Sequence, residues 1–118
     1  MDEALPRPDR IRTLELDGTR SGWIATEVLR GGWLRAVSHR ATAVYALLCL
    51  AADARGVSFY AVEALGREVG LDDGDVRVAL TRLEQLELVA SRAELRQVLR
   101  VPVGGPPRRT PSFALGGR

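Results

Sequence analysis

The chain has 118 residues, of which 17 are basic and 15 acidic, so its formal net charge at pH 7 is only +2. This length suits one small domain with a single core and terminal extensions. Its one cysteine, Cys49, excludes an internal disulfide and a multi-cysteine metal site. No apolar run is long enough to cross a bilayer, and the charged, proline-broken N-terminus is unlike a secretory signal. We therefore expect a cytoplasmic protein without membrane contact.

Charge is distributed unevenly along the chain. All of the basic residues are arginine, a bias that indicates a GC-rich genome more than phosphate recognition. Residues 71–91 contain two arginines and five acids, whereas residues 92–118 contain six arginines and one acid. The basic character is therefore concentrated in the C-terminal part of the chain.

The N-terminal third predicts extensions to a core domain. Residues 1–9, with two prolines among charges, are expected to be a flexible leader. Residues 10–37 predict an N-terminal arm, in which residues 10–16 and 19–25 form a β-hairpin around Asp17-Gly18, a typical hairpin-turn dipeptide. This hairpin is either a docking or oligomerisation arm or an extension packed over the core, and we slightly favour the latter.

The arm is expected to end in a short helix. Thr26 can cap this helix, and Gly31-Gly32 weakens or breaks it. Its apolar side consists of Val28, Leu29 and Trp33. In a chain so poor in aromatic residues, tryptophans are more often core anchors than stacking platforms for bases, and we interpret Trp23 and Trp33 in that way.

The first long helix is predicted from His39 to about Ala54, with Ser38 as its N-cap. Its apolar positions cover so much of its circumference that we expect it to be central and buried. They are Ala43, Val44, Leu47, Leu48, Leu50, Ala51 and Ala54. Cys49 lies among them as an inert core thiol, and residues 57–59 then predict a short strand.

Residues 58–89 predict two helices joined by a tight turn and followed by a strand. Gly70 suits a left-handed cap at the end of the first helix, and Asp72 or Asp73 can cap the second, at about 73–86. The apolar face of the first helix consists of Val62, Leu65 and Val69. The apolar face of the second helix consists of Val76, Ala79, Leu80, Leu83 and Leu86. The opposite face of the second helix consists of Gly74, Arg77, Val78, Thr81 and Gln85. The second helix therefore has a free side to offer a partner.

Residues 88–91 and 95–101 predict a hairpin with Arg92 at its tip. On its second strand, Arg96, Val98 and Arg100 share one face, whereas Leu95, Gln97, Leu99 and Val101 share the face expected to pack inward. The first set can reach phosphates or can be an ordinary solvated face, and the two interpretations weigh equally. Residues 102–118, rich in Pro, Gly and Arg, predict a flexible basic tail.

The spacing of apolar and charged residues in this region resembles a known family. The resemblance rests on Leu65, Glu68-Val69-Gly70-Leu71, Val76-Arg77, Ala79-Leu80, Arg82-Leu83-Glu84 and Leu88-Val89. These residues are similar to the winged helix-turn-helix of bacterial regulators of the GntR and MarR type and of plasmid and phage replication initiators. The resemblance covers roughly residues 38–101 and implies an α+β fold, mainly α with a small β wing.

The sequence departs from that family pattern at three places. Ala61 stands where the helix before the turn usually starts on Ser or Thr, and Glu87 stands where the second helix usually ends in Gly. A left-handed glutamate would cost on the order of 1 kcal/mol, so a different helix ending is expected. Asp72-Asp73-Gly74-Asp75 replaces the usual Ser-Arg or Ser-Pro-Arg at the start of the second helix, which normally faces phosphates.

The resemblance implies a DNA-binding protein, either a transcription regulator or a replication-associated factor, with double-stranded DNA as its partner. Arg77, Thr81 and Gln85 would face the major groove, Arg82 would flank it, and Arg92, Arg96 and Arg100 would bind the backbone. The acidic helix start opposes this interpretation, because carboxylates repel phosphate. It also has a simple explanation, since acids stabilise a helix N-terminus.

The alternative is a protein-interaction winged helix, a homodimer or adapter without specific DNA binding. Gly74, Val78 and Thr81 form a small exposed face that suits helix contact, and the acidic start would attract a basic partner. We favour DNA binding, on the resemblance and on the basic C-terminal part. An enzyme is not expected: His39 is the only histidine and lacks partners for catalysis or metal binding, and no cofactor motif is present.

Overall fold

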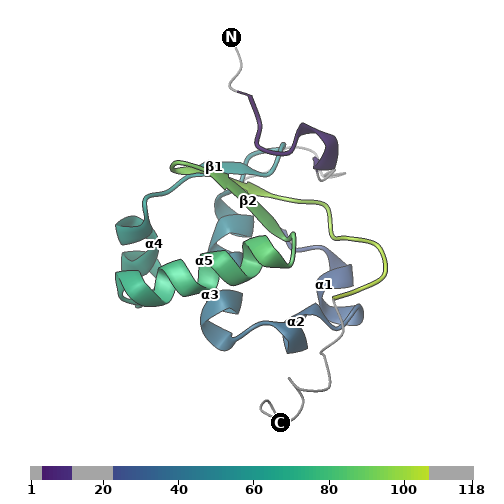
Figure 1. Ribbon diagram of the computed structural model, residues 1–118, viewed down its shortest axis with the longest axis horizontal. Helices are drawn as coiled ribbons and strands as arrows, with labels where there is room; N and C mark the ends of the chain where they lie inside the picture. The colour runs from purple at the N-terminus through teal and green to yellow at the C-terminus, as the bar shows by residue number, and fades with distance from the viewer. Residues whose placement is uncertain (1–3, 12–22, 107–118) are drawn as a thin grey trace.

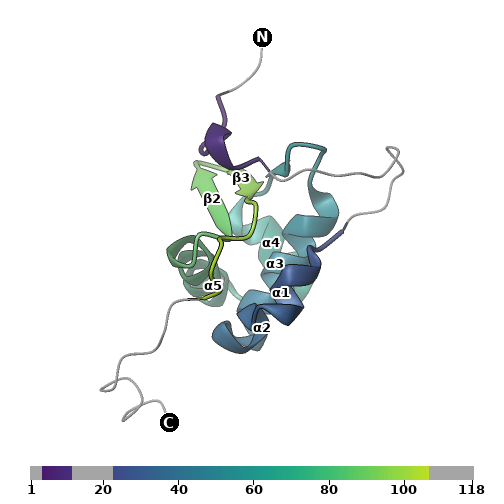
Figure 2. The ribbon, with the colours of Figure 1, turned by 90° about the vertical axis from the view of Figure 1, so that its right-hand side faces the viewer.

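The structure, a computed structural model, describes residues 4–11 and 23–106. They fold into five α-helices, a 3-10 helix and a three-stranded sheet, an α+β arrangement (Figure 1). In chain order these are η1 (Pro8–Arg10), α1 (Thr26–Arg30), α2 (Trp33–Ala36), α3 (His39–Ala51), β1 (Val57–Phe59), α4 (Val62–Val69), α5 (Asp73–Gln85), β2 (Val89–Arg92) and β3 (Leu95–Val98). The helices lie on one side of the sheet and residues 4–11 on the other (Figures 1 and 2).

Helix α3 begins as predicted and ends earlier. The Ser38 hydroxyl accepts a hydrogen bond from the Ala41 N–H at 3.0 Å, which confirms the N-cap. The helix ends at Ala51 because the Asp53 carboxylate accepts the N–H groups of Arg55 and Val57, and these bonds hold the chain in a turn toward β1. Leu50, expected to be buried, is 61% exposed, so α3 buries one side rather than its whole circumference.

Helices α4 and α5 are joined by the predicted tight turn. Gly70 has φ 75°, in the left-handed region that glycine tolerates, and ends α4 as expected. Gly66 allows the turn to close, because a Cβ at this position would lie 2.4 Å from the Leu71 carbonyl oxygen. The Asp72 carboxylate accepts the Asp75 N–H at 2.8 Å and caps α5. The predicted apolar face of α5 is confirmed: Val76, Ala79, Leu80, Leu83 and Leu86 are all buried.

The end of α5 contradicts the expectation that Glu87 avoids a left-handed conformation. Glu87 has φ 61°, and the N–H groups of Glu87 and Leu88 donate to the carbonyls of Glu84 and Leu83, each at 3.0 Å. This is the bonding pattern of a Schellman cap, normally completed by glycine. Arg10 braces the strained residue: its guanidinium donates to the Glu87 carboxylate at 2.9 Å and to the Glu87 carbonyl at 3.2 Å.

The sheet has the order β1-β3-β2 with both pairs antiparallel, so β3 is the central strand. A two-residue turn, Ala93-Glu94, joins β2 to β3, which confirms the predicted hairpin, although β3 ends at Val98 rather than Val101. All four residues of β3 are buried. The strand lies between the helices and residues 4–11, and this two-sided cover was not expected.

The predicted inward and outward faces of β3 are therefore wrong. Val98, assigned to the solvent face, is 1% exposed and belongs to the core shared with the helices. Gln97, assigned to the inward face, reaches residues 4–11 instead: its amide oxygen accepts the Arg7 N–H at 2.8 Å and its amide nitrogen donates to the Arg7 carbonyl at 2.9 Å.

Residues 4–9 are not the flexible leader expected from their composition. Besides the Gln97 bonds, the Pro8–Arg10 turn leads to an isolated bridge between Ile11 and Leu99. The predicted hairpin falls mostly on residues 12–22, and much of the predicted tail on residues 107–118, both outside the described residues.

The short helical segment before α3 also differs in detail. Ala25, rather than Thr26, is the residue before α1, and Gly32, with φ 85°, separates α1 from α2. Trp33 therefore lies in α2, where it is 1% exposed and confirms its assignment as a core anchor. Leu29 was expected on the apolar side and is 66% exposed.

We expect Leu80→Ala to lower the free energy of unfolding by about 2–5 kcal/mol, as truncation of a buried leucine does. Val78→Ala is the matched control on the same helix, since Val78 is 70% exposed and its truncation should change stability by no more than about 0.5 kcal/mol. Urea denaturation of both variants measures the difference. Equal effects of the two substitutions would contradict the assigned buried face.

We expect Arg10→Ala to destabilise the protein by about 1–2 kcal/mol, because it removes hydrogen bonds from the guanidinium to Glu87 and to the Arg100 carbonyl. Arg30→Ala is the control: Arg30 is exposed, and no hydrogen bond or ion pair of its side chain is found among the described residues. Thermal unfolding followed by circular dichroism compares them. A variant as stable as the control would show that residues 4–11 do not brace the end of α5.

Candidate nucleic-acid interface

Helix α5 exposes one face to solvent. Gly74, Arg77, Val78, Thr81 and Gln85 are all exposed, as predicted, because the opposite face of the helix is packed in the core. Among them, Arg77, Thr81 and Gln85 follow one another at intervals of one helical turn. Within the described residues the Arg77 guanidinium makes no hydrogen bond or ion pair. The face therefore offers one free cation and two neutral hydrogen-bonding groups.

Arg82 lies at the side of this face, and its guanidinium is partly engaged in a hydrogen bond within the protein. Its Nη2 donates to the Ala36 carbonyl at 3.3 Å, which connects α5 to the end of α2. Together with Ser38 and Val78, Arg82 borders a shallow hollow of about 510 Å³ along α5. Arg82 thus lies beside the exposed face of α5, but part of its hydrogen-bonding capacity is used within the protein.

The predicted backbone-binding arginines of the hairpin are not equivalent. Arg92 is exposed at the tip, where its Nη2 donates to the Ala4 carbonyl. Arg100 is exposed after β3, and its backbone is held by Arg10: the Arg100 N–H donates to the Arg10 carbonyl at 3.1 Å. Both side chains are exposed, but that of Arg92 is partly engaged by Ala4, and the two residues lie at opposite ends of the hairpin.

Arg96 does not face solvent as predicted, since it is only 7% exposed. Its Nε donates to the Tyr60 carbonyl at 3.1 Å and its Nη1 to the Ser91 hydroxyl at 3.1 Å. Burial lowers the pKa of this guanidinium, although arginine remains charged at any physiological pH. Arg96 therefore holds the residue after β1 to β2, and we remove it from the set of backbone-binding residues.

The acidic start of α5 is partly engaged inside the protein. Asp72 caps the helix, and the Asp75 carboxylate lies 3.6 Å from the Arg40 Nε, so a neighbouring cation offsets one charge. Asp73 is exposed, and among the described residues it has no ion pair or side-chain hydrogen bond. The repulsion of a phosphate would thus come mainly from Asp72 and Asp73, a smaller effect than three carboxylates without a neighbouring cation would give. The sequence analysis missed Arg40 because its partner lies in another helix.

A second hollow, of about 500 Å³, lies between α5 and the hairpin. It is bordered by the start of α4, by the middle of α5 and by the hairpin turn. Arg77 and Arg96 line it, but so do Glu63, Glu84 and Glu94. None of these three glutamates was predicted as a site residue, because they come from separate segments and no spacing along the sequence shows that they meet. The surface between α5 and the hairpin is therefore mixed in charge rather than basic.

A metal site finds no support in the described residues. Residues 4–11 and 23–106 contain no group of three or more His, Cys, Asp and Glu side chains that could hold a metal ion. Cys49 is buried in α3, while His39 is exposed in its first turn. In the same part of the chain, no helix has the length and apolar character to cross a bilayer.

Comparison with models of protein families, with curated proteins and with solved structures finds no match to this chain.

Proposed function

We propose that residues 38–101 form a winged helix-turn-helix and that the protein binds double-stranded DNA through α5. The observation that carries this proposal is the exposed row Arg77, Thr81 and Gln85 on a helix whose other face is fully packed. Arg and Gln side chains can form paired hydrogen bonds with base edges in the major groove. A helix held rigidly from behind can present such groups in a fixed register.

The order of the elements supports this proposal. Helix α3, strand β1, helices α4 and α5, and the hairpin β2–β3 follow one another as the winged helix-turn-helix requires. Helix α5 would enter the groove, and the hairpin with Arg92 and Arg100 would lie along the backbone. The role would be that of a transcription regulator or a plasmid or phage replication factor.

The electrostatic attraction would come from few groups. Arg77, Arg92 and Arg100 are the exposed arginines of the proposed surface. Glu94 lines the same hollow as Arg77, and Asp73 is exposed at the start of α5. The six arginines of residues 92–118 include Arg108 and Arg109, which would add nonspecific attraction to phosphates. Tests of DNA binding therefore require the full chain.

A protein-interaction module is the second candidate. It is favoured by Val78, which is 70% exposed between the small residues Gly74 and Thr81, beside the hollow along α5. A helix of a second copy or of a basic partner could pack on this apolar strip. This candidate predicts no measurable affinity for DNA at low salt, and that result would end the proposal of DNA binding.

We expect the double variant Arg77→Ala, Gln85→Ala to lose discrimination between DNA sequences more than nonspecific affinity. Each lost base contact should remove about 1–3 kcal/mol of preference for the selected site. A site selected from random duplexes by the wild-type protein, titrated against a shuffled duplex, measures this difference by fluorescence anisotropy. An unchanged preference in the double variant would show that α5 does not read bases.

The matched comparison replaces two hairpin arginines, Arg92→Ala and Arg100→Ala. If both contact phosphates, affinity should fall to a similar degree for every sequence. The slope of log affinity against log salt should also become less steep, by roughly 0.9 per lost contact. Arg30→Ala, which removes an exposed charge from α1, should leave the slope unchanged.

We expect Asp73→Asn to strengthen DNA binding, because it removes the least engaged carboxylate from the start of α5 while keeping its size. Asp75→Asn is the comparison: it also frees Arg40, so it should strengthen binding at least as much. Titrations at two salt concentrations measure both, and the gain should shrink at high salt. A loss of affinity in either variant would count against phosphates at this helix start. A basic protein partner would instead bind these variants more weakly.

A further inference from the structure

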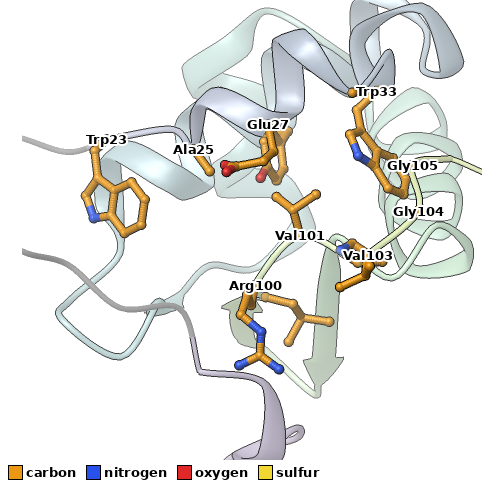
Figure 3. A pocket seen from close by; sticks show the side chains of 13 residues that line it. Trp23, Ala25, Glu27, Trp33, Arg100, Val101, Val103, Gly104 and Gly105 are labelled. Atoms are coloured by element: carbon orange, nitrogen blue, oxygen red, sulfur yellow. The ribbon is translucent and has the colours of Figure 1, made fainter.

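A hollow of about 650 Å³ lies away from α5, between α1 and the chain that follows β3 (Figure 3). One wall is formed by Trp23, Glu27 and Trp33, and the other by Val101 and Val103 with the two glycines after them. The volume falls within the range of sites that bind small molecules. Arg100 is the one proposed DNA-binding residue that lines this hollow.

The aromatic residues of the chain are concentrated at this hollow. The sequence contains two tryptophans, two tyrosines and two phenylalanines, and both tryptophans and Tyr45 line the same space. Trp33 and Tyr45 are almost fully buried, whereas Trp23 is partly exposed. Indole rings offer a large apolar surface with a negative electrostatic potential over each face, which favours flat rings and cations.

The charged groups of the hollow also favour a cation. Glu27 lies in the first turn of α1, is exposed, and points toward the space between the two walls (Figure 3). Arg100 is the other charged lining residue, but its guanidinium extends away from Glu27 and from the tryptophans (Figure 3). A negative ligand would meet the Glu27 carboxylate, whereas a positive one would be attracted by it.

We propose that this hollow binds a small organic cation that carries a flat aromatic group. The ring would lie against Trp23 and the valines of the opposite wall, and the cationic group would lie beside the Glu27 carboxylate. Apart from Arg100, this site shares no residue with the proposed DNA-binding surface, and its test needs no nucleic acid.

Benzamidine and benzamide make a suitable pair of probes, since they have nearly the same shape and only the amidinium is charged at neutral pH. Both tryptophans of the chain line the hollow, so their fluorescence reports on its occupancy directly. We expect benzamidine to change the tryptophan emission saturably and benzamide to bind up to about fivefold more weakly, because benzamide cannot form the partly exposed charge pair with Glu27. The difference should shrink as salt is raised.

Glu27→Gln should abolish the preference for benzamidine and leave the affinity for benzamide unchanged. Glu63→Gln is the matched control, because Glu63 is likewise an exposed glutamate in the first turn of a helix, α4, and it does not line this hollow. The control should keep the wild-type preference. Melting curves of both variants verify folding, and the salt dependence of the wild-type protein tests the charge without any substitution.

Three results would overturn the proposal. The first is the absence of a saturable fluorescence change with benzamidine up to its solubility limit. The second is equal affinity for benzamide and benzamidine. The third is an unchanged preference in Glu27→Gln, which would place the cation elsewhere on the surface.

Discussion

The packing of α5 against α3 is the contact on which the rest of the structure depends. These two helices share the most extensive interface between elements, built from the continuous apolar faces of both. Each fully buried leucine or valine in it contributes roughly 1.5–3 kcal/mol through removal of apolar surface from water. Because one face of α5 is buried against α3, its other face is held in a fixed orientation toward solvent. Any function of Arg77, Thr81 and Gln85 depends on that orientation.

The two ends of α5 are set by different means. At its start, Gly66 and Gly70 allow the close turn and Asp72 caps the helix, all of which are local effects. At its end, a left-handed Glu87 replaces the usual glycine, and the strain is accepted because Arg10 binds this residue from a segment 77 positions earlier in the chain. Residues 4–11 thus belong to the folded unit: they cover the far face of the sheet and stabilise the helix that faces the solvent.

Arginine performs two separate tasks in this protein. Arg10 and Arg96 use their guanidinium groups to bind carbonyl and side-chain oxygens within the fold, and Arg82 does so in part. Arg77 and Arg100 extend from the surface, where Arg77 has neighbouring glutamates, and Arg92 is exposed but also donates to the Ala4 carbonyl. The count of basic residues therefore overstates the positive charge available to a phosphate backbone. If α5 binds DNA, its contribution is mainly hydrogen bonding to bases, and nonspecific attraction has to come from Arg92, Arg100 and the arginines that follow them.

Local patterns in the sequence were enough to predict the order of the helices and strands from Ser38 to Val98, both faces of α5, the Ser38 cap and the hairpin, and they limited the cap of α5 to Asp72 or Asp73. These features depend on helical periodicity, capping and turn chemistry, which act over a few neighbouring residues. The conformations and contacts of Arg96, Gln97 and Glu87 could not be predicted from local patterns, because each depends on a partner that is distant in the sequence. A strand of alternating residues has two faces, and only the three-dimensional arrangement shows that β3 is covered on both, by helices on one side and by residues 4–11 on the other. The grouping of Trp23, Glu27 and Trp33 with Val101 and Val103 has the same origin, since contacts between distant segments leave no periodic signal in the sequence.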